Sequence, residues 1–155
     1  MCSSDLVCRS EGWPLPVAFQ PQYNLVAREP YETDFAPIVA EFGLGVIPYA
    51  ALASGFLTGK YRTATDNAGA ARQSAAARYL TSTGLAVLAA LDQIAAAHGV
   101  EVASVAIAWL LTRPGVVAPL ASARTVDQLG PLFAAATLNL TADEVHALDR
   151  AAAEA

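Results

Sequence analysis

The stretch of this sequence with the clearest chemical potential is YAALASGFLTGKYR, which runs from Tyr49 to Arg62 directly after an apolar segment. Small side chains such as Ala, Ser and Gly let backbone N–H groups approach a ligand closely. Lys60 adds a compact positive charge that suits a phosphate oxygen. The stretch is therefore compatible with a loop that holds an anionic ligand. The alternative is a surface loop with a solvated lysine, because the glycine spacing is not that of a P-loop.

A second stretch, SARTVDQL at residues 122–129, has the pattern of a helix start. Thr125 and Gln128 have the spacing of a capping box, in which each side chain bonds the backbone N–H of the other residue. The free N–H groups and the dipole at a helix N-terminus favour a bound anion. This stretch is therefore a second candidate for contact with a negatively charged ligand.

Composition excludes several other classes of function. The chain has 155 residues, a formal net charge of −5 and a pI of about 4.8, which argues against nucleic acid or an anionic membrane as a partner. It has neither a long apolar run nor a secretory signal, so we expect a cytoplasmic protein. Cys2 and Cys8 would close only a tiny loop, and His98 and His146 lie far from them. We therefore expect neither a disulfide framework nor a metal site.

The two candidate stretches need elements to position them, and the chain predicts alternating strands and helices. Short apolar runs at 17–25, 44–52 and 116–122 predict three buried strands, while a long loop follows from residue 53 to about 80. Helical spacing and stop residues predict helices at 31–43, 84–99 and 102–115, with further helices starting at Thr125 and Thr141. The alternation predicts an α/β fold with a parallel sheet. Three strands alone leave two edges unpaired, so the sheet is expected to be part of something larger.

Residues 1–16 differ from the rest of the chain in their residue types and in their lack of a hydrophobic pattern. They mix turn formers with isolated apolar residues and show no periodicity. We expect them to be a disordered or non-native leader, and residues 17–155 to form the structured part.

Four segments together resemble the aldo-keto reductases: QPQYNLVARE, IPYAALASGFLTGKYR, VAIAWLLTRPGVVAPLASARTVDQL and LTADEVHALD, in the order found in that family. The resemblance implies a TIM-type (β/α)8 barrel that holds NADP(H) at the carboxyl ends of its strands. It covers residues 17–155, which would correspond to the last three strands of the barrel with their helices.

By this resemblance, the nicotinamide end of the cofactor would meet two strand ends. The amide of Gln20 would hold the nicotinamide carboxamide, since an amide both donates and accepts hydrogen bonds. Tyr49 would stack against the nicotinamide ring. The alternatives are a glutamine that only caps a strand and a tyrosine of the barrel mouth. The resemblance also implies that Leu52, Ala53, Ser54 and Gly55 wrap the diphosphate and that Lys60 supplies charge.

The resemblance assigns the adenosine end of the cofactor to later residues. Ser122, Arg124 and Gln128 would hold the 2′-phosphate that distinguishes NADP from NAD. Arg72 would close over the cofactor from the long loop, with Arg78 as the alternative. Relatives carry an acidic residue and an asparagine near the end of this motif where this chain has Pro131 and Leu132. The adenine contacts are therefore open, and Gly130–Pro131 is expected to disturb the helix after its first turn.

The family's catalytic set of Asp, Tyr, Lys and His lies on earlier strands, so no catalytic residue is expected here. Tyr23, Lys60, Asp92 and His98 stand in other motifs and are not substitutes. The resemblance implies an NADP(H)-dependent oxidoreductase that reduces a small aldehyde or ketone in its intact form. A nucleotide-binding or structural barrel piece without catalysis is the alternative. Substrate identity and oligomeric state are left open.

Overall fold

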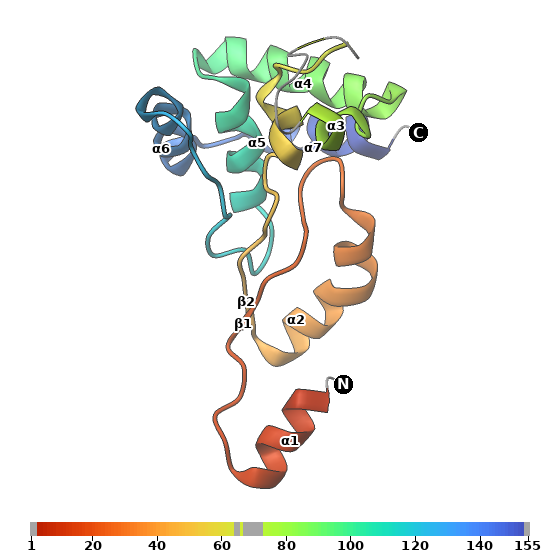
Figure 1. Cartoon of the computed structure of the whole chain (residues 1–155), viewed down its shortest axis with the longest axis vertical. Helices are drawn as coiled ribbons and strands as arrows, with labels where there is room; N and C mark the ends of the chain where they lie inside the picture. Colours follow the sequence, from red (N-terminus) through yellow and green to blue (C-terminus); the bar gives the residue numbers. More distant parts are fainter. Residues whose placement is uncertain (1–2, 64–65, 67–72, 154–155) are drawn as a thin grey trace.

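The computed structural model describes residues 3–63, 66 and 73–153 (Figure 1). The elements are, in chain order, α1 (Ser3–Glu11), β1 (Ala18–Phe19), the π-helix η1 (Pro30–Phe35), α2 (Ala36–Phe42), β2 (Gly45–Val46), the 3₁₀ helix η2 (Ala53–Thr58), α3 (Gln73–Ala77), α4 (Ser82–His98), α5 (Val102–Leu111), the 3₁₀ helix η3 (Val126–Gln128), α6 (Leu129–Thr137) and α7 (Ala142–Ala153). The chain is thus α/β, as predicted.

The sheet is parallel, as predicted, and its three strand segments lie side by side in chain order. Strand β1 pairs with β2 in register Ala18↔Gly45 and Phe19↔Val46. The third segment joins the other edge of β2 through a parallel bridge between Val46 and Val116. The Leu120 N–H continues this pairing with a 2.8 Å hydrogen bond to the carbonyl of Pro48.

The regular strands are much shorter than the predicted runs, with two residues each in β1 and β2. Pro21, Pro48 and Pro119 lie within the three runs. Proline has no N–H, so each one removes a possible hydrogen bond of the ladder. Extended chain continues on either side, as in the parallel bridge between Gln22 and Tyr49.

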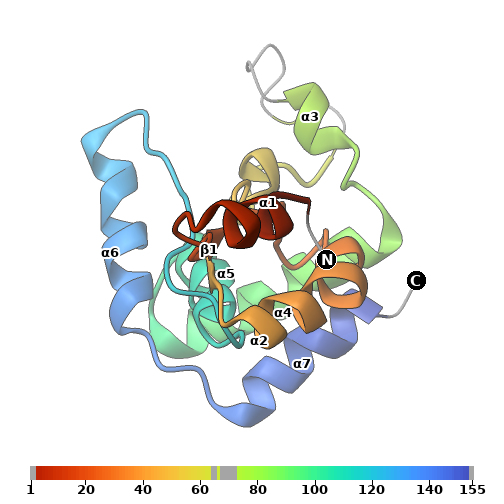
Figure 2. The same cartoon turned by 90° about the horizontal axis from the view of Figure 1, so that it is seen from below.

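Within the described residues, helices cover one face of this sheet and leave the other open. Val46 and Pro48 are buried, whereas Val117 is 62% exposed and Tyr49 is 46% exposed on the opposite face. Helices α3 to α7 gather at one end of the molecule, and the run of β1 and β2 extends away from them toward α1 (Figure 1). Seen from below, α3, α6 and α7 lie at the periphery around α4 and α5 (Figure 2).

The core centres on α5, which is buried on all sides. The sequence predicts a single apolar stripe on this helix, but every residue from 103 to 110 is buried. The reason is that α4, α6 and η2 all pack against α5. A helix that is surrounded in this way can be apolar all round. Trp109, fully buried, is the largest side chain of the core.

The predicted stops of two helices are confirmed. Gly43 and Gly99 follow α2 and α4 in the left-handed conformation, with φ of 61° and 64°. This conformation lets their N–H groups reach the last free carbonyls of the helix. Glu101 precedes α5 and, as expected of a weak cap, forms no side-chain capping bond.

A capping box forms at the start of α7, whereas the one predicted at Thr125 does not. In α7, the Thr141 N–H bonds Glu144 Oε2 at 2.8 Å, and the Glu144 N–H bonds Thr141 Oγ1 at 3.3 Å. The side chain of Thr125 makes no such bond to η3. Gln128 instead accepts from the N–H of Arg124 at 2.8 Å, because the chain enters through a 3₁₀ turn. Pro131 falls in the first turn of α6, where a proline is tolerated, and the helix continues to Thr137.

Two segments that the sequence predicts to be irregular contain helices. Residues Ser3–Glu11 form α1, so this segment is helical, while the assignment of residues 1–16 to a separate leader stays a prediction. The long loop contains η2 and α3. Among the described residues, no single helix is long and apolar enough to cross a membrane. Helices α4 and α5, which are bent by 98° relative to each other, reach the length and apolar composition of a membrane span only when they are counted together.

Acidification is expected to weaken the attachment of α7 to α4. The Thr141 N–H, followed by the nearby His98 side chain, lowers the pKa of Glu144 below its ordinary value of 4.5. His98 Nε2 lies 2.7 Å from Glu144 Oε1 and links the end of α4 to α7. A lowered pKa in the folded state gives stability that is present above pH 4.5 and is lost as the pH falls through the folded value.

The measurement is the thermal midpoint of the chain and of Glu144→Gln between pH 7 and pH 3, by circular dichroism. The difference between the two proteins should be largest near neutral pH and should shrink below the ordinary glutamate pKa. A difference that stays constant across this range would contradict the assignment.

Candidate functional site

The two predicted nicotinamide residues lie at neighbouring strand ends. Gln20 directly follows β1 and is exposed, and Tyr49 follows β2 on the uncovered face of the sheet. The Tyr49 N–H donates to the Pro21 carbonyl at 2.8 Å, which fixes the two strand ends beside each other. The structure therefore brings an amide and an aromatic ring to the same edge, where a flat polar ring could lie against both.

The loop that follows β2 has an unusual backbone. Ala50, Ala53 and Ser54 have φ of 55°, 48° and 59°, and Gly55 has φ of 93°. Non-glycine residues adopt this left-handed region only rarely, because Cβ then crowds the backbone. Such conformations gather at ligand-binding sites, where successive turns form concave nests of backbone N–H groups. Three of these four residues were predicted to wrap the diphosphate.

Lys60 folds back across this loop. A Cβ built on Gly55 would lie 3.2 Å from Lys60 Cε and 3.4 Å from its Nζ. The ammonium group also lies 5.0 Å from the centre of the Tyr61 ring. The predicted charge and the predicted small-residue loop are thus adjacent, and Gly55 leaves the space that the lysine crosses.

Packing beneath the loop holds its shape. Ala53, Phe56 and Leu57 are completely buried, and Thr58 Oγ1 donates to the Gly55 carbonyl at 2.8 Å. Asn24, also completely buried, donates from Nδ2 to the Ala50 carbonyl at 2.9 Å. This role of Asn24 is not among the sequence predictions. The available signal was an asparagine between Tyr23 and Leu25, inside the apolar run 17–25, where a buried amide needs hydrogen-bond partners.

The predicted 2′-phosphate residues form a separate, exposed turn. Ser122, Arg124 and Gln128 are all exposed, and they precede η3 and α6. The bond from the Arg124 N–H to Gln128 Oε1 orders the turn locally. Arg124 and Gln128, which are both expected to contact the 2′-phosphate, therefore contact each other, and the guanidinium of Arg124 faces solvent.

Of the two arginines in the long loop, Arg72 lies outside the described residues. Arg78 is exposed, and its Nη2 donates to Tyr79 Oη at 2.6 Å while its guanidinium stacks on the same ring. Gln22 Nε2 also donates to Tyr79 Oη, at 3.3 Å. Tyr79 therefore links the end of the long loop to the strand ends. The choice between Arg72 and Arg78 stays a prediction.

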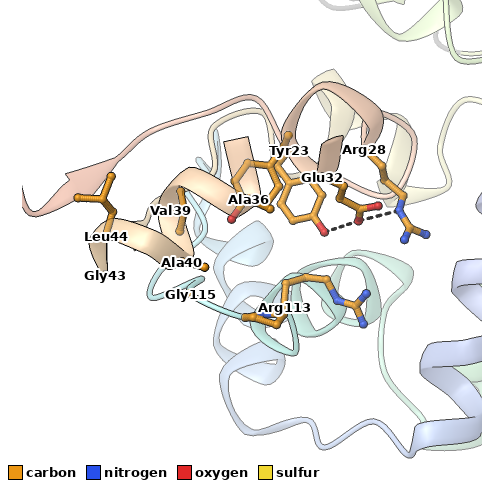
Figure 3. A pocket seen from close by; sticks show the side chains of 12 residues that line it. Tyr23, Arg28, Glu32, Ala36, Val39, Ala40, Gly43, Leu44, Arg113 and Gly115 are labelled. Atoms are coloured by element: carbon orange, nitrogen blue, oxygen red, sulfur yellow. Dashed lines mark hydrogen bonds and ion pairs between the residues drawn. The ribbon is translucent and has the colours of Figure 1, made fainter. Parts of the chain in front are cut away.

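A separate groove lies between α2 and the turn after α5 (Figure 3). It has a volume of about 570 Å³. Its charged groups bind one another: Glu32 Oε1 accepts from Tyr23 Oη at 2.7 Å and from Arg28 Nε at 3.0 Å. Burial, aided by Glu32, raises the pKa of Tyr23 above its usual range, so this hydroxyl stays protonated. These paired groups support the packing of η1 against the core, and the expectation that Tyr23 has no catalytic role stays a prediction.

A parallel α/β sheet with a nest-like loop and a lysine at its carboxyl edge defines a class of proteins that bind ligands at strand ends. The comparisons with known proteins then give the family. The chain belongs to the aldo/keto reductase family, whose sequence model matches residues 4–153. This confirms the resemblance inferred from the four segments.

Individual relatives agree with this assignment. The chain is 35% identical over 123 residues to a probable voltage-gated potassium channel subunit beta of Oryza sativa subsp. japonica, covering 74% of this chain and 36% of the relative. It is 32% identical over 159 residues to the aldo-keto reductase ausK of Aspergillus calidoustus, covering 92% and 40%. It is 46% identical over 56 residues to aflatoxin B1 aldehyde reductase member 2 of Rattus norvegicus, covering 36% and 15%. The chain therefore spans less than half the length of these relatives.

Proposed function

We propose that the chain forms part of the NADP(H) site of a cytoplasmic carbonyl reductase built on a (β/α)8 barrel, and that it corresponds to the last three βα units. The substrate of the intact enzyme is a small aldehyde or ketone, and neither nucleic acid nor a membrane is a partner. The observation that carries the proposal is the left-handed loop of residues 50–55 with Lys60 across it.

The residues present fit the cofactor in three places. The loop and Lys60 suit the diphosphate, because backbone N–H groups and an ammonium group both favour a dianion. Gln20 and Tyr49 suit the nicotinamide, and the turn of Ser122, Arg124 and Gln128 suits the 2′-phosphate. When bound, the cofactor supplies the hydride, while this chain binds and orients it.

The proton donor must come from elsewhere. The candidate substitutes within the chain are engaged in structural pairs: Tyr23 with Glu32, and His98 with Glu144. We therefore propose that the chain binds the cofactor without turning over a carbonyl substrate, since acid–base residues typically contribute about 10²–10⁴-fold to such reactions.

The test is cofactor binding by this chain, measured by titration calorimetry with NADPH and NADH, alongside an assay of nitrobenzaldehyde reduction. NADPH should bind without turnover. Arg124→Ala should weaken NADPH by about 10- to 100-fold, because a hydrogen bond to a charged group contributes roughly 1.5–3 kcal/mol. It should leave NADH almost unchanged, since NADH lacks the 2′-phosphate.

Arg150→Ala is the matched control, since Arg150 is an exposed arginine on α7, outside the proposed site. It should bind both cofactors as the parent chain does. Equal weakening of NADPH and NADH by Arg124→Ala would contradict the 2′-phosphate assignment. Absence of NADPH binding by the unsubstituted chain, or turnover above a heat-treated control, would contradict the proposed function.

A second candidate is a barrel subunit that binds nucleotide or a protein partner without catalysis. It is favoured by the relative named as a probable channel subunit beta. Supplying the first five βα units of a reductase relative as a separate chain distinguishes the two functions, because only the first predicts restored aldehyde reduction.

A further inference from the structure

Arg62 ends the candidate diphosphate loop and makes an extensive set of polar contacts for a half-exposed residue. Its Nη1 and Nη2 bind Asp92 Oδ2 and Oδ1 at 2.6 and 2.7 Å, so the pair is bidentate. Its Nε donates to the Gly59 carbonyl at 2.9 Å. Its backbone N–H donates to Asp66 Oδ2 at 2.7 Å. One side chain and its own backbone thus fix the last turn of the loop.

Asp92 gives this turn a rigid attachment. It lies in the middle of α4, next to the completely buried Leu91, and α4 packs against α5 and α7. Most exposed ion pairs contribute little, because two flexible side chains must be ordered in high dielectric. A bidentate guanidinium–carboxylate pair differs from most exposed pairs, because its two parallel hydrogen bonds fix the direction of both side chains as well as the distance between them.

The geometry of Gly59 shows how tightly the turn is set. It has φ of 79°, and a Cβ built there would lie 2.8 Å from Arg62 Nη2. Lys60 is the next residue, and it sits between this left-handed glycine and the clamped Arg62. The contacts of Arg62 therefore restrict the direction in which Lys60 leaves the backbone, and hence its path over Gly55.

We propose that the Arg62–Asp92 pair positions Lys60 for the diphosphate group of a dinucleotide. The inference rests on the proposed function and deepens it, because it names two positioning residues at that site. Arg62 acts through Lys60: it holds the turn, and Lys60 contacts the phosphate oxygens. Loss of the pair leaves the charge of Lys60 intact but allows its side chain to turn into solvent.

The experiment compares two ligands in the 155-residue chain and in Arg62→Ala, Arg62→Lys and Asp92→Asn. NADPH contacts the whole proposed site, whereas adenosine 2′-monophosphate has no diphosphate and reports on the 122–128 turn alone. Calorimetric titration should show NADPH weakened about tenfold by Arg62→Ala and by Asp92→Asn, with adenosine 2′-monophosphate unchanged. Arg62→Lys keeps the charge but loses the bidentate geometry, so it should fall between the two.

Hydrogen exchange provides the readout of position. Amides of residues 53–62 should exchange faster in Arg62→Ala and Asp92→Asn, while those of α5 should not change. Arg150→Ala is the control and should match the parent chain in every measurement. Equal weakening of both ligands would show a general structural role and overturn the inference, as would unchanged NADPH affinity. Failure of the parent chain to bind NADPH would instead refute the proposed function, and the inference with it.

Discussion

Replacement of Asp149 by alanine is expected to lower the free energy of unfolding by about 3 kcal/mol, because one carboxylate accepts from the buried Trp109 and from two partly buried arginines. Asp149 Oδ1 accepts from Trp109 Nε1 at 3.0 Å and from Arg28 Nη1 at 2.9 Å. Arg113 Nη1 lies 3.3 Å from its other oxygen. Both guanidinium groups also stack on the Trp109 ring, at 5.2 and 4.7 Å from its centre. Removing the carboxylate leaves two partly buried positive charges side by side.

Chemical denaturation followed by circular dichroism measures this effect. Asp143→Ala is the matched control, because Asp143 lies in the first turn of the same helix. Its loss should lower the stability by less than about 1 kcal/mol, through the helix dipole alone. Similar losses in the two variants would show that the network around Trp109 contributes little.

Replacement of Gly84 by alanine is expected to destabilise the chain by about 2–3 kcal/mol, although glycine-to-alanine changes inside helices usually stabilise. Gly84 lies in the first turn of α4, and its N–H bonds the Thr81 hydroxyl at 3.0 Å. A Cβ there would lie 1.9 Å from the carbonyl oxygen of Tyr79 and 3.1 Å from Phe56 Cζ. The oxygen belongs to the backbone, so the chain itself must move.

Gly130→Ala is the control for this prediction. Gly130 is also helical, in α6, but a Cβ built there meets nothing within 4 Å. It should change the stability by less than about 1 kcal/mol, because the helix propensity of alanine is opposed by crowding of the new Cβ against the ring of Pro131. If Gly84→Ala changed the stability as little as Gly130→Ala, the close contact with Tyr79 would be refuted.

The parts of the fold that the sequence predicts correctly are those set by local patterns. Helical spacing followed by Gly43 or Gly99 marks two helix ends, and alternating strands and helices give the parallel sheet. Predictions fail where the structure depends on residues that are distant in the sequence. The sequence predicts one apolar stripe on α5, but the helix is buried all round. The reason is that α4, α6 and η2 pack against it, and the sequence of α5 alone does not reveal these neighbours. Thr125 fails as a cap because the chain arrives through a 3₁₀ turn.

The roles of the candidate-site residues stay predictions, but their geometry can be compared with the sequence. Small residues and Lys60 after an apolar run are compatible with an anion-binding loop, whereas a left-handed Ala50 or Ala53 has no sequence signal, since alanine does not prefer that conformation. Arg62 and Asp92 are 30 residues apart and become partners only when α4 packs. The family resemblance assigned roles to residues one by one, but the contacts that hold those residues come from tertiary structure.

The three left-handed residues Ala50, Ala53 and Ser54 have a consequence for the kinetics of ligand association. Each costs roughly 1–2 kcal/mol relative to ordinary backbone, a strain that the completely buried side chains of Phe56 and Leu57 offset during folding. The loop therefore loses its conformational entropy before any ligand arrives. A dinucleotide would meet a surface already in its bound shape, so its association should follow a single phase whose rate rises with ligand concentration, without a slow closing step.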